Sequence, residues 1–364
     1  MKIKVLHIIN ALGRGGAEVL LRDGLKYSND KYYEYHYIYI KSHPNDMAKE
    51  VTAQGGKVLS LKADGLFQLI FVPYKIRKYV KRNSIDIIHS HLTVSGILAR
   101  VSFLFTNIPV VHTEHNIIDR YPYLLRKIHI ILWKRFSKVI AISDDVKENI
   151  DKNIKNNINS EIIYNGIDLE YYEEYACKKN NSKVPVVGTV ANIRKQKRID
   201  IFIRVAKKVK SMGYRCKFVI VGDGVMMDQM KAYSKENNVD DILEFVGKKK
   251  DVRPYLTAMD LFILTSEYEG FGIVIIEAMA MKIPVISTKV SGVSNIIQNG
   301  NNGILVEYNN ETENNMAKEI IDLISDEERI KRITKNAHSM VNERYGMKKM
   351  QKKIEETYSK LMLA

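Results

Sequence analysis

Residues 261–287 hold the pattern that most restricts the fold of this chain. The apolar run at 261–264 has the length and composition of a strand buried in a parallel sheet. A loop with Glu269 and two glycines follows, and then a helical pattern that Pro284 ends ahead of the next apolar run. This order is typical of an open α/β sheet, which binds ligands at the carboxyl ends of its strands.

The loop after this strand is suited to an anion. The first amides of the following helix, at Ile273 and Val274, have no acceptor inside the helix and lie at the positive end of its dipole, which suits a phosphate. Glu277 follows about one turn later, where its carboxylate could accept hydrogen bonds from sugar hydroxyls. An ordinary connection with solvated acids is the alternative.

The run EGFGIVIIEAMAMKIPVI, which begins at Glu269, resembles the retaining glycosyltransferases of family 4. Members carry two glutamates with seven residues between them, usually as EGFGLVLLEAMA, a small residue and PVI. Here Met281 and Lys282 replace the usual small or glycine pair. The resemblance implies the GT-B architecture, with two doubly wound, Rossmann-like domains that face each other across a cleft. It also implies that Glu269 lies against the donor sugar, that Gly272 belongs to the donor site, and that Glu277 holds the ribose.

The rest of the chain fits two α/β domains, because 364 residues are too many for one compact core. The polar run at 178–183 predicts a boundary between one domain at 1–177 and another at 184–345. The resemblance implies that the first binds the acceptor and the second the nucleotide-sugar. By resemblance, a helix at 346–364 crosses back to the first domain. Strands that alternate with helices are expected at 3–9, 36–40, 85–89, 110–113, 138–142, 162–164, 186–190, 217–221, 243–246, 261–264 and 285–287.

The net charge of +15 is concentrated in one part of the chain. Residues 66–138 hold 12 Lys and Arg against 3 Asp and Glu, and the stretch 121–138 adds large apolar residues, including Trp133. This composition suits a helix on an anionic membrane surface, with Lys134 and Arg135 reaching lipid phosphates. A buried helix with a solvated basic edge is an equal alternative. Nucleic acid ranks below both, because no nucleic-acid-binding motif accompanies the charge.

Two glycines and two basic residues are further candidates for the donor site. Gly15 and Gly16 lie in a glycine loop after the first strand, and in the resembling family the equivalent turn covers the donor's phosphates. After the strand at 186–190, the family has an arginine followed five residues later by a lysine. That spacing assigns Lys197 to the diphosphate, whereas Asn192 stands at the arginine position, so Arg194 is assigned as the substitute for its charge.

Histidines gather at the ends of two predicted strands, at His89, His91, His112 and His115. A metal site is an open but disfavoured interpretation, because successive strand residues alternate faces and no His-Glu-x-x-His motif is present. The resemblance instead implies one histidine that hydrogen-bonds near the donor sugar and stabilises developing charge. His115 is assigned this role, with His112 as the alternate.

The predicted function is a retaining transfer of a sugar from a nucleotide diphosphate-sugar, with UDP as the favoured nucleotide, to an acceptor hydroxyl. The lack of an Asp-x-Asp pair predicts that no metal and no cofactor is needed, and the departing diphosphate is the expected base. A lipid-linked glycan of surface polysaccharide synthesis is the expected acceptor. A nucleotide-sugar epimerase of the same architecture and a non-catalytic nucleotide-sugar-binding protein are the alternatives.

The location of the protein is predicted from two features of the sequence. The first apolar stretch lacks the features of a signal peptide, and two cysteines give no disulfide framework. The cytoplasm is therefore expected, with peripheral attachment to the inner face of the membrane left open.

Overall fold

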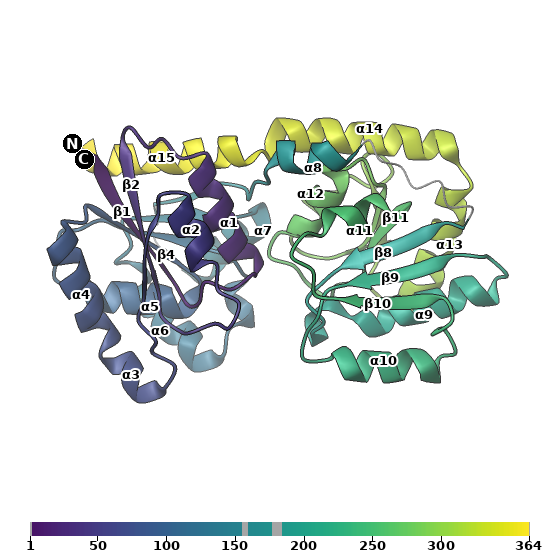
Figure 1. The fold of residues 1–364 in the computed structure, drawn as a ribbon, viewed down its shortest axis with the longest axis horizontal. Helices are drawn as coiled ribbons and strands as arrows, with labels where there is room; N and C mark the ends of the chain where they lie inside the picture. The colour runs from purple at the N-terminus through teal and green to yellow at the C-terminus, as the bar shows by residue number, and fades with distance from the viewer. Residues whose placement is uncertain (1, 155–158, 177–183, 364) are drawn as a thin grey trace. The chain divides into compact units, whose positions relative to one another are not determined.

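The predicted α/β fold with two doubly wound sheets is confirmed. The computed structural model describes residues 2–154, 159–176 and 184–363. The chain divides into two compact units (Figure 1), Met1–Ile167 with Met347–Ala364, and Asp168–Gly346. The boundary predicted at 178–183 and the predicted end of the first domain at Cys177 lie outside the described residues.

The first unit is built on a parallel sheet of seven strands in the order β3-β2-β1-β4-β5-β6-β7. Its strands are β1 (Ile3–Ile9), β2 (Tyr33–Tyr39), β3 (Lys57–Ser60), β4 (Ile87–His91), β5 (Val110–Glu114), β6 (Lys138–Ala141) and β7 (Ser160–Ile162). The direction in which strands are added reverses between β1 and β4. The carboxyl ends of these two strands therefore flank the point where doubly wound sheets bind ligands.

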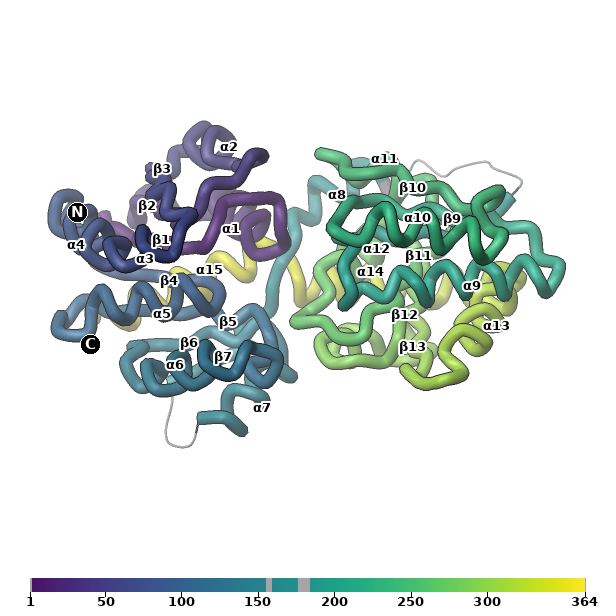
Figure 2. Tube along the Cα trace, turned by 90° about the horizontal axis from the view of Figure 1, so that it is seen from below, coloured from purple at the N-terminus to yellow at the C-terminus, as the bar shows by residue number. Residues whose placement is uncertain are grey.

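Helices cover both faces of this first sheet. They are α1 (Gly16–Lys26), α2 (Ala48–Ala53), α3 (Leu66–Ile70), α4 (Val72–Asn83), α5 (Thr93–Ser102), η1 (Ile118–Arg120), α6 (Tyr123–Trp133), α7 (Asp144–Asn153) and α15 (Met347–Leu363). Helices α4, α5 and α6 lie side by side (Figure 2), and α15 contacts α1. The α15 helix is held on the sheet by the buried Tyr358 and by the Tyr33 hydroxyl, which donates to the Glu355 carbonyl at 2.8 Å.

The second unit holds a parallel sheet of six strands in the order β10-β9-β8-β11-β12-β13. Its strands are β8 (Val186–Val190), β9 (Lys217–Val221), β10 (Leu243–Gly247), β11 (Leu261–Leu264), β12 (Val285–Lys289) and β13 (Ile304–Glu307). Its helices are α8 (Leu169–Ala176), η2 (Lys195–Lys197), α9 (Ile199–Ser211), α10 (Met227–Glu236), α11 (Arg253–Thr257), α12 (Ile273–Ala280), α13 (Thr312–Ile324) and α14 (Glu327–Arg344). Here the order reverses between β8 and β11, so the loops that follow these two strands meet.

Several element boundaries differ from the predicted ones. Strands β3 and β13 were not among the predicted strands, and both are four-residue strands at an edge of their sheet. Strand β4 runs to His91 rather than ending at 89, and β7 occupies 160–162 rather than 162–164. Helix α12 already ends at Ala280, ahead of Pro284. Short strands carry too few residues for an alternation pattern to set their ends.

Helix α6 only partly fits the predicted membrane-surface helix. Trp133 is buried and stands edge-on to His129, with ring centroids 4.8 Å apart, so it is a core residue rather than an interfacial anchor. The side chains of Tyr123, Leu124 and Ile131 on the same helix are exposed. Among the residues that the structure describes, no helix has the length and apolar content to span a bilayer.

Candidate active site

Glu269 lies in the loop between β11 and α12, and its carboxylate is oriented by two donors. The Lys197 ammonium and the Ser266 hydroxyl each donate to Oε1 of Glu269 at 2.6 Å. Glu269 is 6 % exposed. Within the described part of the chain, no side chain or amide donates to Oε2 of Glu269, so this oxygen is left as an acceptor for a ligand.

The backbone of Glu269 is held by the loop that follows β12. The Glu269 amide donates to the Ser291 carbonyl at 3.2 Å. Gly292, the next residue, has a φ of +77°, and a Cβ there would lie 2.5 Å from the Glu269 carbonyl oxygen. Only glycine allows both this backbone angle and this approach. The position of Glu269 therefore depends on a residue 23 places further along the chain.

The turn that bears Lys197 is tied to the Glu269 loop at three further points. The Gln196 side-chain amide donates to the Tyr268 carbonyl at 2.7 Å, and the Glu267 amide donates to the Gln196 carbonyl at 2.9 Å. The Thr265 hydroxyl lies 3.1 Å from the carbonyl oxygens of Lys197 and Arg198. The two loops after β8 and β11 thus form one polar unit.

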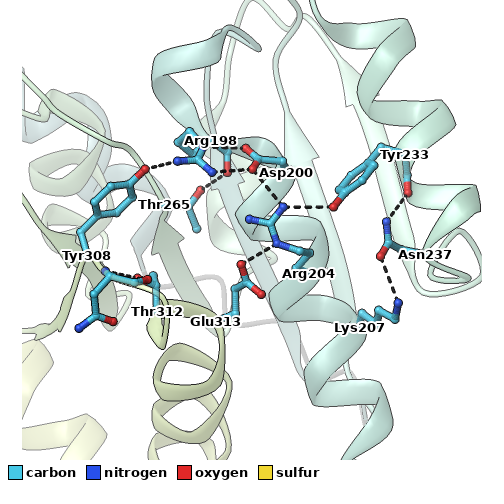
Figure 3. A network of polar contacts seen from close by, with 11 residues as sticks. Arg198, Asp200, Arg204, Lys207, Tyr233, Asn237, Thr265, Tyr308, Thr312 and Glu313 are labelled. Carbon is cyan, nitrogen blue, oxygen red and sulfur yellow. Dashed lines mark hydrogen bonds and ion pairs between the residues drawn. The ribbon is translucent and has the colours of Figure 1, made fainter.

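A network of charged residues begins at Arg198, the residue directly after this turn (Figure 3). Arg198 forms two hydrogen bonds to Asp200, at 3.0 and 2.8 Å, and also donates to the Tyr308 hydroxyl. Arg204 binds Asp200 at 3.1 Å and Glu313 at 2.6 Å. Arg198 has a φ of +47°, an angle that a non-glycine residue adopts at a cost, and the ion pairs with Asp200 offset part of it.

The amino end of α12 has the form that the sequence predicted. Gly272 has a φ of +86° and precedes the helix, which begins at Ile273. The amides of Ile273 and Val274 belong to the first turn, so they have no acceptor within the helix. Glu277 lies one turn further in and accepts a hydrogen bond from the Tyr172 hydroxyl at 2.7 Å. A ribose at Glu277 would share this carboxylate with Tyr172.

Three of the other predicted donor contacts are exposed. Arg194, which precedes η2, is exposed, in contrast to Lys197, whose side chain is only 11 % exposed. Gly15 and Gly16 are also exposed, and Gly15 stands at the amino end of α1. These three residues offer donors to a ligand. Their assignment to the donor stays a prediction.

His115 lies directly after β5, in the first unit, and contacts His91. Its Nε2 is 3.3 Å from Nδ1 of His91, whose Nε2 is 2.9 Å from Nδ1 of His7. Burial lowers the pKa of His115 to about 4 and that of His7 to about 3, and it lowers the pKa of His91 well below its usual value. All three rings are therefore neutral at pH 7.

The alternate, His112, points to the opposite face of the sheet, as strand alternation requires. It lies 3.6 Å from the Glu114 carboxylate, which also accepts from His129 at 3.0 Å. All three residues are buried, and these contacts help to lower the pKa of Glu114. His112 thus belongs to a buried polar cluster with α6 rather than to the row that contains His115.

Two clusters have side chains of the kinds that bind metal ions. The ligand atoms of His7, His89 and His91 lie within 4.8 Å of one another, as do those of the cluster around Glu114. In the first cluster, His7 and His91 already share a hydrogen bond, and both nitrogens of His89 are bonded, to the Tyr358 and Thr113 hydroxyls. The prediction that no metal is needed stays a prediction.

Two family models account for most of the chain. "Glycosyltransferase Family 4" matches residues 14–171, and "Glycosyl transferases group 1" matches residues 173–340. The chain belongs to the family 4, group 1 glycosyltransferases. This glycosyltransferase is therefore an enzyme that transfers sugars.

Relatives of this glycosyltransferase include enzymes whose names give different activities. It is 27% identical over 335 residues to N-acetyl-alpha-D-glucosaminyl L-malate synthase of Bacillus anthracis, covering 87% of this chain and 85% of the relative. It is 28% identical over 252 residues to UDP-Gal:alpha-D-GlcNAc-diphosphoundecaprenol alpha-1,3-galactosyltransferase of Escherichia coli (64% and 65%). The capsular polysaccharide biosynthesis glycosyltransferase CapM of Staphylococcus aureus is 24% identical over 351 residues (88% and 87%).

Solved structures confirm the architecture. The structure of Anabaena Alr3699/HepE in complex with UDP-glucose has a TM-score of 0.86 to this chain, with 22% sequence identity. The match covers 98% of this glycosyltransferase and 100% of that chain. At this identity, the likeness shows the fold, which is GT-B as the sequence implied.

Sequence reasoning missed several residues around the glutamate of this glycosyltransferase. Ser266 stands three residues before Glu269, on the same short loop, and its hydroxyl could have been proposed from that spacing. Gln196 and Thr265 act through contacts between loops that are about 70 residues apart, which no local pattern indicates. His7 was seen only as part of a strand.

Proposed function

We propose that this glycosyltransferase moves a sugar from a UDP-sugar to an acceptor hydroxyl with retention of the anomeric configuration. One observation carries the proposal: Glu269 is held through Oε1, and its Oε2 is left to accept from the hydroxyls of a sugar. The amino end of α12 follows within the same loop and offers the amides of Ile273 and Val274 to a pyrophosphate. The family and the UDP-glucose in the Anabaena structure support this donor class.

The roles of the charged residues follow from their positions. Lys197 carries a positive charge next to Glu269 and would neutralise part of the charge on the departing diphosphate. Glu269 would orient the sugar and support the positive charge that develops at its anomeric carbon. Since the polar groups at this site include a lysine ammonium and helix amides, the diphosphate can be stabilised without a metal ion.

A panel of nucleotides and sugar donors tests the donor class. UDP and UDP-sugars should raise the unfolding temperature of the protein, because ligands that bind only the folded state stabilise it. ADP, GDP and dTDP, with their sugars, serve as controls. Transfer by the preferred donor is then followed in EDTA, and the anomeric configuration of the product is read by NMR. An inverted product, or full dependence on a divalent metal, contradicts the proposal.

The acceptor is proposed to be a lipid-linked glycan, because the first unit has an exposed apolar patch beside basic residues. We define the α3–α4 patch as the side chains of Leu66, Phe67, Ile70, Phe71 and Tyr74, which are 49–86% exposed. The exposed side chains of Lys75, Lys78, Lys81 and Arg82 follow on α4. Apolar side chains next to a basic helix suit insertion into an anionic membrane, where lipid-linked acceptors are found.

Vesicle sedimentation tests the membrane surface. The protein should bind vesicles with phosphatidylglycerol and should not bind neutral phosphatidylcholine vesicles at physiological salt. Phe67→Ser with Ile70→Ser should abolish binding and leave donor-induced stabilisation unchanged. Val225→Ser is the matched control, since Val225 is 94% exposed but lies in the second unit. If the double variant binds vesicles as well as the native protein does, the α3–α4 patch is not a membrane-binding surface. A small soluble acceptor then becomes the better interpretation.

A further inference from the structure

Three histidines form a continuous row at the carboxyl edge of the first sheet. His7 comes from β1, His91 from β4, and His115 from the residue after β5. Strands β1, β4 and β5 are adjacent in the sheet, and the three side chains project from the same face. The row runs from the half-buried His115 inward to His7, which is 6 % exposed.

The two hydrogen bonds in this row restrict where the protons can be. Each ring is neutral, because burial lowers its pKa, and a neutral imidazole carries one N–H. The single proton of His91 lies either on Nε2, toward His7, or on Nδ1, toward His115. If it lies on Nε2, His115 must donate from its own Nε2. If it lies on Nδ1, His115 must accept through Nε2.

The proton on His91 therefore decides what His115 offers to a ligand. In the first arrangement all three rings carry Nε2–H, and Nδ1 of His115 is a hydrogen-bond acceptor. In the second, all three carry Nδ1–H, and Nδ1 of His115 is a donor. Mixed arrangements break one of the two hydrogen bonds, and leaving a buried nitrogen unpaired costs about 1–3 kcal/mol.

We propose that His91 and His7 are positioning residues that fix the tautomer of His115, with the proton on Nε2 and the Nδ1 lone pair turned to the substrate. This rests on the proposed function and on the role that the family resemblance implies for His115, a hydrogen bond near the donor sugar. A sugar hydroxyl that donates to Nδ1 becomes more electron-rich, which stabilises positive charge at the anomeric carbon. A donating Nδ1–H would do the opposite.

The histidine row borders a cavity in the first unit. A cavity of about 40 Å³ is bordered by His7, His91 and His115, with Asn165 and Gln351 also on its wall. A buried water needs about 10–15 Å³ of such space, so the cavity has room for two or three. A water at His7 can accept from its Nε2–H, which completes the arrangement with all protons on Nε2.

The neighbouring His89 does not compete for this row. Its Nδ1 is bonded to the Tyr358 hydroxyl on α15, and its Nε2 lies 2.7 Å from the Thr113 hydroxyl. Hydroxyl groups can both donate and accept, so His89 imposes no tautomer on the rings beside it.

Nitrogen-15 NMR of the histidine rings in the full, ligand-free chain tests the proposal. The ring shifts of His7, His91 and His115 should all report a proton on Nε2. His91→Phe and His7→Phe keep an aromatic ring, and both native rings lie against aromatic neighbours. Each variant should leave His115 in a mixture of tautomers and lower kcat by about three- to tenfold, with a smaller change in the KM for the donor.

A matched control and several outcomes keep the test decisive. His36→Phe removes another buried histidine of the same sheet, bonded to Tyr79 and Glu34, and should not change the His115 shifts. Any of three results overturns the proposal. These are a difference in tautomer among the three rings, ring shifts of His115 that are the same in folded His91→Phe as in the native protein, and binding of one equivalent of metal by the protein. If the shifts are as expected but the His115→Ala variant transfers sugar normally, the tautomers of the row are confirmed and a catalytic role for His115 is contradicted.

Discussion

The Lys197 ammonium lies 2.6 Å from Oε1 of Glu269, although the two residues are 72 positions apart in the chain. The pair is largely buried, with 11 % and 8 % of the two side chains exposed. It joins the loop after β8 to the loop after β11, at the point where the strand order reverses. A charge that would face the diphosphate and a carboxylate that would face the sugar are thus held at a fixed separation.

Replacement of Glu269 by glutamine should reduce transfer far more than it reduces stability. Glutamine still accepts from Lys197 or Ser266, but it removes the negative charge that would support the transition state. We expect kcat/KM to fall on the order of 10²- to 10³-fold. Glu267→Gln, two residues away on the same loop, is the matched control and should change it less than threefold. Steady-state kinetics of both variants measure this difference. Equal losses of kcat/KM in the two variants contradict the assignment of Glu269.

Replacement of Lys197 by methionine should weaken binding of the nucleotide diphosphate. A hydrogen bond to a charged group contributes about 1.5–3 kcal/mol, so the Kd for UDP should rise about 10- to 100-fold, as measured by calorimetry. Lys195→Met is the control, because Lys195 is exposed in the same turn. A Kd that rises equally in the Lys195 variant would mean that only the net charge of the turn matters.

Gly292→Ala should lower both the stability of the second unit and its activity. A left-handed φ costs alanine about 1 kcal/mol, and the new Cβ would in addition lie 2.5 Å from the Glu269 carbonyl oxygen. Gly300→Ala separates the two effects, since its φ is +75° and no atom lies within 4 Å of the added Cβ. Chemical denaturation should show a loss for Gly292→Ala that exceeds the loss for Gly300→Ala, and only Gly292→Ala should lose transfer.

The first unit should lose stability as the pH falls below about 6.5. The folded pKa of His7 is about 3 and that of His91 is also depressed, whereas both titrate near 6.5 when unfolded. Between these values the unfolded chain binds more protons, so acid favours unfolding, by about 1–2 kcal/mol for each such histidine at pH 5. Unfolding midpoints at pH 7.5, 6.5 and 5.5 measure this slope. His7→Phe should make it shallower, and a midpoint independent of pH contradicts the neutral, buried rings.

Much of the candidate site could be predicted from sequence because it is local. Glu269, Gly272 and the first turn of α12 lie within a few residues of one another, and periodicity with glycine placement specifies such a strand–loop–helix unit. The positions of side chains that depend on burial were harder to predict from the sequence. The basic and apolar composition of residues 121–138 suggested that Trp133 lies at a membrane surface, but in the structure Trp133 packs against His129 in the core.

The sequence alone determined the fold class, the loop that bears Glu269, and the alternation that separates His112 from His115. The tertiary structure decided which side chains meet: Lys197 with Glu269, Gly292 beneath the Glu269 backbone, and His7 with His91. These pairs are 23 to 84 residues apart, and only the order of strands in each parallel sheet makes them neighbours. Local sequence patterns do not indicate that strand order, because it depends on how whole helices and strands bury their apolar faces.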